Sequence, residues 1–380
     1  MSTAKRIALF LDGTWNTREN NTNVWRLKSL CNCNDEQIIY YSKGVGTGLG
    51  EKVTGGALGY GTNQEVVDAY EWLMDHYEEG DRLYVFGFSR GAYTARSLAG
   101  LISKCGLLRP GSPISVTEFY DRYRQDNKVR TIRELNSPQA KEESFTQQER
   151  WMRKYCMAPA IWLLGVWDTV GALGIPVGNI ADISSTSYHF LETDLRINID
   201  RAYHALAIDE NRKKFAPTLW VKPVGSTYPD RPLAEVEQRW FVGAHANVGG
   251  GYVDDILAQR PLQWLMGKAR EHGLTFRADV SIDGDILTAP IADSYAEFIH
   301  GIFKHLPLRY YRPIGDKPVT GISSDGVTIN ETIDQSVFDR WRSGVSYRPK
   351  NLVDWAARKK VDINSLATSV RADDPTTVVI

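Results

Sequence analysis

Three residue types that together perform nucleophilic catalysis follow apolar segments of this chain, in the order serine, aspartate, histidine. The serine, Ser89, lies in Gly87-Phe88-Ser89-Arg90-Gly91, which matches the G-x-S-x-G nucleophile elbow between a strand and a helix. The elbow needs glycine two residues to either side of the serine, because a Cβ there would strike neighbouring backbone. Such a turn would hold Ser89 in a strained conformation, with its Oγ above the sheet.

The residues around this motif supply the context that a bare G-x-S-x-G pattern lacks. An apolar, β-prone run over 82–88 precedes the serine, and a helix-forming run that includes Ala92, Ala95 and Ala99 follows it. The alternative is a surface turn that happens to contain serine. Strand, turn and helix in succession favour the nucleophile.

Two further polar residues end apolar runs later in the chain. Asp168 follows the run 160–167, and His245 follows the run 238–243 in a glycine-rich loop. Since parallel strands end at the same edge of a sheet, we expect Ser89, Asp168 and His245 to form a triad in the order seen in α/β-hydrolases. His245 would take the proton of Ser89 Oγ, and Asp168 would orient the ring and stabilise the imidazolium. Asp254 and Asp209 are the rival acids; Asp168 is favoured because it ends a strand.

A turn-rich segment, 12–16, follows the first apolar run, 7–11. The backbone N–H of Arg90, with one from Gly13 or Thr14, would stabilise the tetrahedral oxyanion. A plain β-turn before a helix over 23–30 is an equally good interpretation of this segment, so both remain open.

A metal site is the third arrangement that the strand ends allow, with Asp12, Asp168 and His245 as ligands. The absence of H-x-H or H-E-x-x-H spacing counts against it. The glycines of the loop 44–61 fit neither G-x-G-x-x-G nor the phosphate loop, so we read a mobile loop beside the site. We therefore expect neither a metal nor another cofactor.

Composition narrows the class of protein. The 380 residues are 42% hydrophobic with a net charge of −1, which gives no reason to expect a nucleic-acid partner. The four cysteines are too few and scattered for a disulfide framework and are typical of thiols in a reducing compartment. No signal peptide or membrane-spanning segment is recognisable, so we expect synthesis in the cytoplasm.

Alternating apolar runs and helical periodicity predict an α/β fold, with a mostly parallel sheet flanked by helices. We expect an α/β-hydrolase core over 1–275, with helical lid insertions at about 110–158 and 172–200. Residues 276–380 would form a C-terminal extension that packs on the core, with 371–380 frayed. The segment 201–209 looks helical, with His204 on its face in a structural role.

Four blocks carry a likeness to a known family: FLDGTWN at 10–16, GFSRGA at 87–92, GVWDTVG at 165–171 and FVGAHANVGGGY at 241–252. Together with RAYHALAIDE at 201–210, they resemble a bacterial and fungal α/β-hydrolase family long known as a domain of unknown function. That family includes the first class of type VI secretion lipase effectors. The resemblance covers about 5–270. Asn247 differs from it, because we expect an aspartate at that position of the histidine block.

This resemblance implies a phospholipase or other carboxylic-ester hydrolase, with Ser89 as nucleophile and His245 as base. It implies a lipid or other ester substrate, export by type VI secretion, and a component of the secretion apparatus or an immunity protein as partner. The competing hypothesis is a catalytically silent binding module on a hydrolase scaffold. A site filled by side chains, with Ser89 beyond hydrogen-bond reach of His245, would favour that module.

Overall fold

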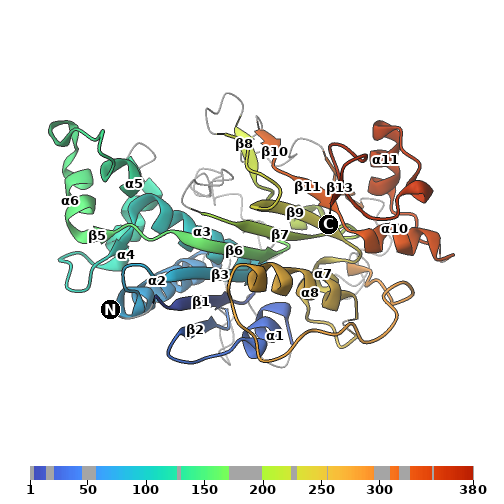
Figure 1. Cartoon of the computed structure of the whole chain (residues 1–380), viewed down its shortest axis with the longest axis horizontal. Coiled ribbons are helices and arrows are strands. Elements are labelled where there is room, and N and C mark those ends of the chain that lie inside the picture. The colour runs from blue at the N-terminus through green and yellow to red at the C-terminus, as the bar shows by residue number, and fades with distance from the viewer. Residues whose placement is uncertain are drawn as a thin grey trace.

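Parallel strands form the centre of the molecule, shown in Figure 1 from a computed structural model. The structure describes residues 4–13, 21–44, 57–125, 130–170, 199–223, 229–254, 256–294, 309–315, 326–344 and 346–379. Within these residues, the sheet has nine strands in the order β13-β12-β11-β9-β7-β6-β3-β1-β2. The strands are β1 (Arg6–Leu11), β2 (Gln37–Ser42), β3 (Arg82–Phe88), β6 (Ile161–Trp167), β7 (Ala202–Ala207), β9 (Val236–Phe241), β11 (Glu331–Ile333), β12 (Ser369–Arg371) and β13 (Val378–Val379).

The strands from β2 to β11 run parallel, and the only antiparallel pairings of this sheet are those of β12 with β11 and with β13, at one edge. The predicted α/β class with a mostly parallel sheet is confirmed. This topology brings the carboxyl ends of β1, β3, β6, β7 and β9 to one edge, which is where open α/β sheets bind their ligands.

Both faces of the sheet are covered, which explains why its strands are continuously apolar. In β1, Ile7, Leu9 and Leu11 belong to one buried cluster, and Ala8 and Phe10 belong to another. The first cluster includes α2 (Ala57–His76), α3 (Arg90–Cys105) and α4 (Val116–Gln125). The second includes α1 (Asn23–Leu30) and α8 (Ile256–Glu271). The sheet is therefore the middle layer of three (Figure 1).

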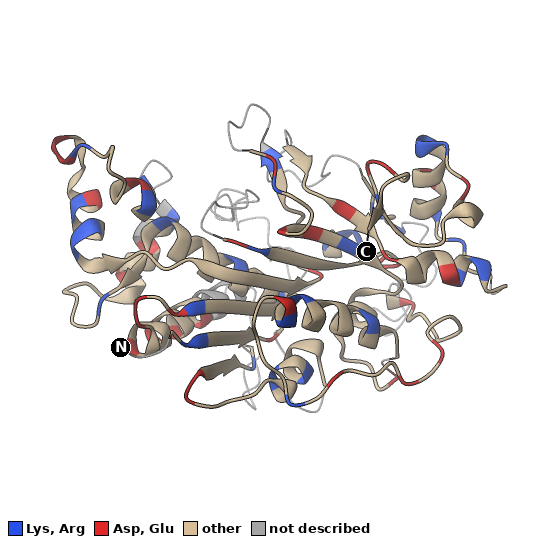
Figure 2. Ribbon diagram, viewed as in Figure 1, with Lys and Arg blue, Asp and Glu red and all other residues tan. Residues whose placement is uncertain are grey.

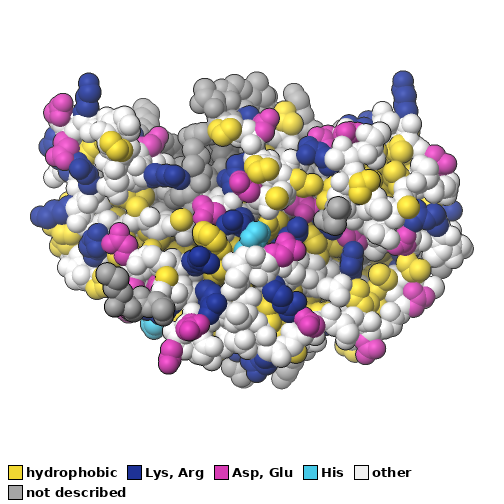
Figure 3. Space-filling model, in the orientation of Figure 1, with side chains coloured by type: hydrophobic (Ala, Val, Ile, Leu, Met, Phe, Trp, Pro, Cys, Tyr) yellow, Lys and Arg dark blue, Asp and Glu magenta, His cyan; other side chains and the backbone are white. Residues whose placement is uncertain are grey.

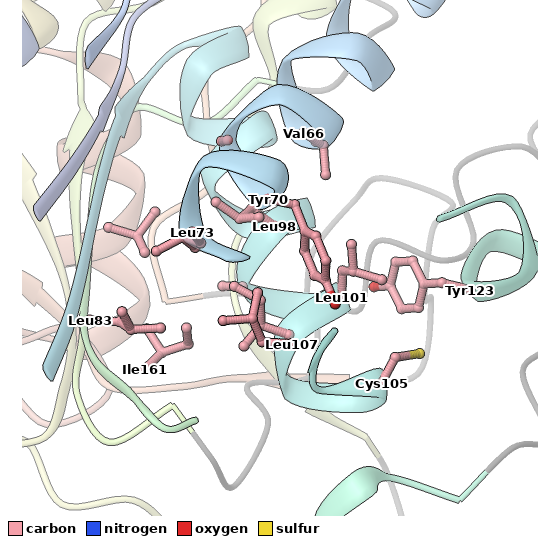
Figure 4. Packing of buried hydrophobic residues seen from close by; sticks show 14 of the residues in the cluster. Val66, Tyr70, Leu73, Leu83, Leu98, Leu101, Cys105, Leu107, Tyr123 and Ile161 are labelled. Atoms are coloured by element: carbon pink, nitrogen blue, oxygen red, sulfur yellow. The ribbon is translucent and has the colours of Figure 1, made fainter. Parts of the chain in front are cut away.

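Helices α2 and α3 pack together over the sheet. In Figure 4, Tyr70 and Leu73 of α2 point toward Leu98 and Leu101 of α3, with Leu83 of β3 below them. Tyr70 is fully buried, and its hydroxyl donates to Gly106 O and accepts from Leu108 N–H. A hydroxyl satisfied on both sides can stay in an apolar core without a desolvation penalty.

The first predicted insertion, 110–158, is helical as expected. It contains α4, α5 (Ile132–Leu135), the 3₁₀ turn η2 (Glu142–Ser144) and α6 (Gln147–Tyr155), which lie at one end of the molecule. Thr131 and Thr146 each begin a helix with a capping box. Figure 2 shows basic and acidic residues interspersed along these helices. The second predicted insertion, 172–200, falls outside the described residues except at its last two positions.

The C-terminal region joins the central sheet instead of only covering it. Strand β11 pairs in parallel with β9, and β10 (Gly326–Thr328) pairs with β8 (Val221–Pro223). Helices α10 (Gln335–Arg342) and α11 (Lys350–Lys359) complete a third buried cluster with Trp240 of β9. The predicted fraying of 371–380 was wrong, because β12 and β13 pair antiparallel there. The division into core and extension at about 275 stays a prediction.

The segment 201–209 is a strand, β7, and the prediction of a helix was wrong. Its residues 202–207, AYHALA, are good helix formers, but β7 lies between β6 and β9 with every residue buried. Tertiary burial on both faces therefore overrides the local helix propensity.

The surface shows acidic and basic side chains interspersed on the face in Figure 3, in keeping with the near-zero net charge. Among the residues that the structure describes, no helix is both long and apolar enough to cross a bilayer.

Candidate active site

Ser89 lies between β3 and α3 with a φ of 57°, a left-handed conformation that is uncommon for a residue with a side chain. A Cβ on Gly87 would overlap with the backbone of Gly91, and a Cβ on Gly91 would overlap with the carbonyl oxygens of Leu11 and Asp12. The two glycines therefore let the turn close and rest against the end of β1. Ser89 is left partly exposed at the N-terminus of α3.

Ser89, His245 and Asp168 form a continuous chain of hydrogen bonds. His245 Nε2 lies 2.8 Å from Ser89 Oγ, and His245 Nδ1 lies 2.6 Å from Asp168 Oδ2. Because Nδ1 donates to the carboxylate, Nε2 of the neutral ring is the acceptor for the serine hydroxyl. The sequence placed these residues at three strand ends, and the fold brings them within hydrogen-bond distance at one edge.

Asp168 is fully buried directly after β6 and has a φ of 38°. Its Oδ1 accepts from Ala207 N–H at 3.0 Å and from Arg312 Nη1 at 2.6 Å, and its Oδ2 accepts from Arg312 Nη2 at 3.0 Å. Burial by itself would raise the pKa of Asp168, but the charge of Arg312 and the hydrogen bond from His245 hold it well below its usual range. The carboxylate facing His245 is therefore ionised.

Two aromatic rings flank the imidazole of His245, which is 7% exposed. The ring of Phe88 lies 4.7 Å away, and that of Phe215 lies 5.1 Å away in an edge-on arrangement. The backbone N–H of His245, at the start of the short helix α7 (His245–Gly249), donates to Glu210 Oε2 at 3.3 Å. The two rings therefore pack against the imidazole, while Glu210 binds the backbone of the residue that carries it.

Of the expected oxyanion donors, Arg90 is the first residue of α3. Amides of a first helical turn point out of the N-terminus and favour negative charge there. The N–H of Gly13 donates to Asp12 Oδ1 at 2.8 Å, so Gly13 would have to release this bond before it could donate to an oxyanion. Thr14 lies outside the described residues.

The carboxylate of Asp12 connects neighbouring secondary-structure elements. Its Oδ2 accepts from the hydroxyls of Thr22 at 2.6 Å and Tyr41 at 3.2 Å, which ties the end of β1 to α1 and β2. The oxygens of Asp168 are engaged by Arg312 and His245. Across the described part of the chain, no group of three or more His, Cys, Asp or Glu side chains is arranged to hold a metal ion.

Comparison with known proteins identifies the family. The model of the T6SS phospholipase effector Tle1-like catalytic domain matches residues 5–268. The chain belongs to this family. The match ends before the C-terminal region, so it contains Ser89, Asp168 and His245 but not Arg312.

Individual relatives of this Tle1-like chain are distant. An uncharacterized protein of Saccharomyces cerevisiae is 30% identical over 240 residues, which is 56% of this chain and 32% of the yeast protein. A crystal structure of an uncharacterized Pseudomonas aeruginosa protein has 18% identity and a TM-score of 0.45, covering 73% of this chain and 47% of that one. The Tle1 effector bound to the VgrG spike of the type 6 secretion system has 18% identity and a TM-score of 0.37, covering 69% and 53%. The chain thus spans about a third to a half of these relatives.

In this Tle1-like domain, neither rival acid pairs with His245. Asp209 Oδ2 accepts from Gly243 N–H at 2.7 Å and from the Tyr347 hydroxyl at 3.1 Å, so it links the ends of β7 and β9. Asp254 is exposed. Asn247, where an aspartate was expected, accepts from Ala244 N–H and Ala292 N–H through Oδ1. The side-chain oxygen of Asn247 thus binds the backbone on both sides of it, at the start of the segment that carries His245 and in the segment around Ala292.

His204 has the structural role expected of it, although it lies on a strand. It is fully buried, and its Nε2 accepts from Thr169 N–H at 3.0 Å. Burial and the nearby Arg96 lower the pKa of His204 to about 3, so the ring is neutral and can accept this bond. His204 thereby fixes the backbone of Thr169, the residue that follows Asp168.

Arg312 is the site residue that sequence analysis missed. It is 0% exposed, although arginine is almost never fully buried without a partner. It lies in a C-terminal segment with weak periodicity, and no motif around it indicates a catalytic role. Its burial against Asp168 depends on tertiary structure alone.

Proposed function

We propose that this chain hydrolyses carboxylic esters of lipids, acting as a phospholipase through Ser89, His245 and Asp168. The observation that carries the proposal is the hydrogen-bond chain from Ser89 Oγ through His245 to Asp168, with contacts of 2.8 and 2.6 Å. Membership of a phospholipase effector family supports a lipid ester as the substrate class.

In the proposed mechanism, His245 Nε2 takes the proton of Ser89 Oγ as the oxygen attacks the ester carbonyl. The imidazolium is stabilised by the Asp168 carboxylate, and the Arg90 N–H stabilises the oxyanion. Collapse of the intermediate expels the alcohol, which takes the proton from His245 and leaves an acyl-serine. Water, deprotonated by His245, then releases the carboxylic acid and restores Ser89.

Activity-based labelling tests this proposal. Wild type, Ser89→Ala and Ser112→Ala are incubated with a fluorophosphonate, the modified residue is mapped, and phospholipid and p-nitrophenyl ester hydrolysis are measured. Ser112 is a suitable control because it is only partly buried and its hydroxyl bonds only to Arg109 O in the described structure. We expect labelling at Ser89 in wild type and Ser112→Ala, with both labelling and hydrolysis abolished in Ser89→Ala.

Two outcomes would contradict the proposal. Equal hydrolysis by wild type and Ser89→Ala would move the chemistry to another residue. A wild type that is inert toward every ester and unlabelled at Ser89 would favour the silent binding module.

We also propose that the chain is exported by a type VI secretion system and that a spike protein is its partner. The support is the family together with the relative described as a Tle1 effector bound to the VgrG spike. Co-purification of tagged full-length chain with VgrG proteins expressed beside it checks this. If it associates with none of the VgrG proteins encoded in the same genome, this partner is wrong.

A further inference from the structure

The guanidinium of Arg312 is enclosed by four oxygen acceptors. Nη1 lies 2.6 Å from Asp168 Oδ1 and 2.8 Å from Ala207 O, and Nη2 lies 3.0 Å from Asp168 Oδ2 and 2.5 Å from Phe215 O. Both oxygens of the carboxylate are therefore bridged by one planar fork, the geometry that arginine provides and lysine does not.

We propose that Arg312 is a positioning residue of the catalytic site, which keeps Asp168 ionised and turned toward His245. This inference rests on the proposed function, and it extends the catalytic machinery into the C-terminal region, beyond the part that matches the family. The hydrogen bonds of Arg312 in the described structure are to Asp168 and to the carbonyls of Ala207 and Phe215, and none is to Ser89 or His245. Arg312 acts on the reaction only through Asp168.

Electrostatics explains why this carboxylate needs a cation. Asp168 is 0% exposed, and an ionised carboxylate without a partner at such a site would be strongly destabilised. One backbone N–H, from Ala207, is the other donor to Asp168 Oδ1. Without Arg312, a proton would be shared more readily between Asp168 and His245, so the pair would hold it to higher pH.

Two titratable groups that bond to backbone N–H groups in or beside the pair, His204 and Glu210, are each held in one state. His204, on β7, is buried and neutral, with a pKa lowered to about 3 by burial and Arg96. Glu210 accepts three hydrogen bonds from Arg212, and its pKa is lowered to about 2: burial alone would raise it, but Arg212 more than compensates. Neither group titrates near neutral pH. Burial raises the pKa of Asp209 to about 6, but Asp209 bonds to Gly243 N–H and the Tyr347 hydroxyl and is the same in every variant compared, so a difference between the variants reports on Arg312.

Arg312 also orients the surroundings of His245. Its bond to Phe215 O fixes the 3₁₀ turn η5 (Lys213–Phe215), whose phenylalanine ring rests against the imidazole. A purely structural role would consist of these carbonyl contacts alone. The test therefore compares variants that remove the charge with variants that remove only the fork.

The experiment uses three full-length variants. Arg312→Gln removes the charge, and Arg312→Lys keeps it but cannot bridge both carboxylate oxygens. Arg340→Gln is the matched control, because Arg340 is 6% exposed, lies in the same C-terminal region and donates to the carbonyls of Ile286 and Ala289. Each is compared with wild type in ester hydrolysis as a function of pH.

A second readout does not depend on turnover. The same substitutions are made in Ser89→Ala, and the imidazole of His245 is titrated by NMR with labelled histidine. We expect Arg312→Gln to shift the titration of the Asp168–His245 pair upward by at least about one pH unit. Arg312→Lys and Arg340→Gln should titrate close to the parent. If Arg312→Gln does not fold, Arg312→Lys still tests the inference. Because lysine retains the cation but cannot bridge both carboxylate oxygens, kcat of Arg312→Lys should fall while the titration of its Asp168–His245 pair stays in place.

In hydrolysis, a one-unit upward shift reduces the active, deprotonated fraction of the pair about tenfold at pH values below the wild-type pKa. We expect kcat of Arg312→Gln to fall at least about tenfold on the acidic limb with little change in KM and to approach the wild-type value at higher pH, so that the acidic limb of kcat/KM moves to higher pH. Arg340→Gln should keep the wild-type limb.

The outcomes separate this inference from the proposed function. An unchanged titration in Arg312→Gln, a shift equal to that of Arg340→Gln, or wild-type kcat in Arg312→Lys would overturn the inference and leave ester hydrolysis standing. A shifted titration in a protein that hydrolyses no ester would overturn the proposed function, while the effect of Arg312 on the pair would stand.

Discussion

At the scale of single residues, two carboxylates at neighbouring strand ends differ because, among the described residues, only Asp168 has a cation within bonding distance. Asp168 follows β6 and is bridged by Arg312, which keeps its pKa well below the usual range against the effect of burial. Asp209 follows β7 and bonds to Gly243 N–H and the Tyr347 hydroxyl, and burial raises its pKa to about 6. A triad acid must be ionised when the histidine becomes charged, and Asp168 meets this condition better.

The two carboxylates should respond differently to amide substitution. Asp168→Asn should lower kcat for ester hydrolysis strongly, by as much as about 10⁴-fold, because the amide removes the charge that stabilises the imidazolium. Asp209→Asn should retain kcat within a few-fold, since Asp209 does not contact His245. Steady-state kinetics of both variants, with thermal unfolding to verify folding, measures this. A larger loss in Asp209→Asn would assign the acid to Asp209.

Glu65 on α2 makes stability depend on pH. It is 7% exposed, and its Oε2 accepts from Thr94 Oγ1, whereas its Oε1 has no hydrogen-bond partner among the described residues. Burial raises the pKa of Glu65 to about 7. Because the folded pKa lies above the unfolded value, the contribution of Glu65 to stability is fully present below about pH 4.5 and is lost as pH rises through 7.

Glu65→Gln should therefore be more stable than wild type at pH 8, by up to about 3 kcal/mol, and about equal to it near pH 4.5. Glu71→Gln, an exposed change on the same helix, should not alter the pH dependence. Urea unfolding at several pH values provides the free energies. Parallel curves for wild type and Glu65→Gln would show that Glu65 is not responsible.

At the scale of elements, the nucleophile depends on how closely β3, α3 and the end of β1 approach one another. The turn at Ser89 rests on Gly91, whose missing side chain leaves room for the carbonyls of Leu11 and Asp12. Phe88 can lie against His245 because Gly249 has no Cβ, which would otherwise overlap with its ring. The geometry of the serine is thus set by contacts among the ends of β1 and β3 and the helices α3 and α7.

Gly91→Ala should destabilise the fold by about 1–3 kcal/mol or more and lower kcat, because its Cβ forces α3 away from β1. Gly267→Ala is the matched control, since nothing lies within 4 Å of a Cβ there and its position is helical. Alanine at 267 should stabilise α8 by about 0.5–1 kcal/mol. Chemical denaturation and ester hydrolysis test both variants; a fully active and stable Gly91→Ala would refute the close approach.

At the scale of the whole molecule, the C-terminal region and the family-matched region share one sheet and one site. Strands β11 to β13 continue the sheet beyond β9, and Arg312 reaches Asp168. Trp355 of α11 is fully buried in the third cluster, and its Nε1 donates to Ala372 O at 2.8 Å. The two regions should therefore unfold together.

Trp355→Ala tests this cooperativity far from the catalytic residues. We expect a loss of about 3–5 kcal/mol in the free energy of unfolding, with one transition in which secondary structure and ester hydrolysis disappear together. Val353→Ala, at a position that is 41% exposed on the same helix, should change stability little. Two separate transitions, with hydrolysis surviving the first, would instead divide the chain into independent units near residue 275.

The sequence by itself determined the elements whose signals are local. The elbow is recognisable from consecutive residues around Ser89. The apolar runs before Asp168 and His245 predict buried parallel strands. Helix α1 occupies the predicted range, 23–30. Because the carboxyl ends of parallel strands lie at one edge of a sheet, the position of these three residues at strand ends was enough to predict that they lie close together.

Only the tertiary structure decided the rest. The segment 202–207 is composed of helix formers and becomes a strand because its neighbours bury both of its faces. Strands β12 and β13 have only three and two residues, which is too short to predict from sequence, but they add to an existing sheet edge. Arg312 lies 144 positions from Asp168, and their pairing has no local signal. Local propensity acts between near neighbours, whereas a buried ion pair is selected by packing between residues that are distant in the chain.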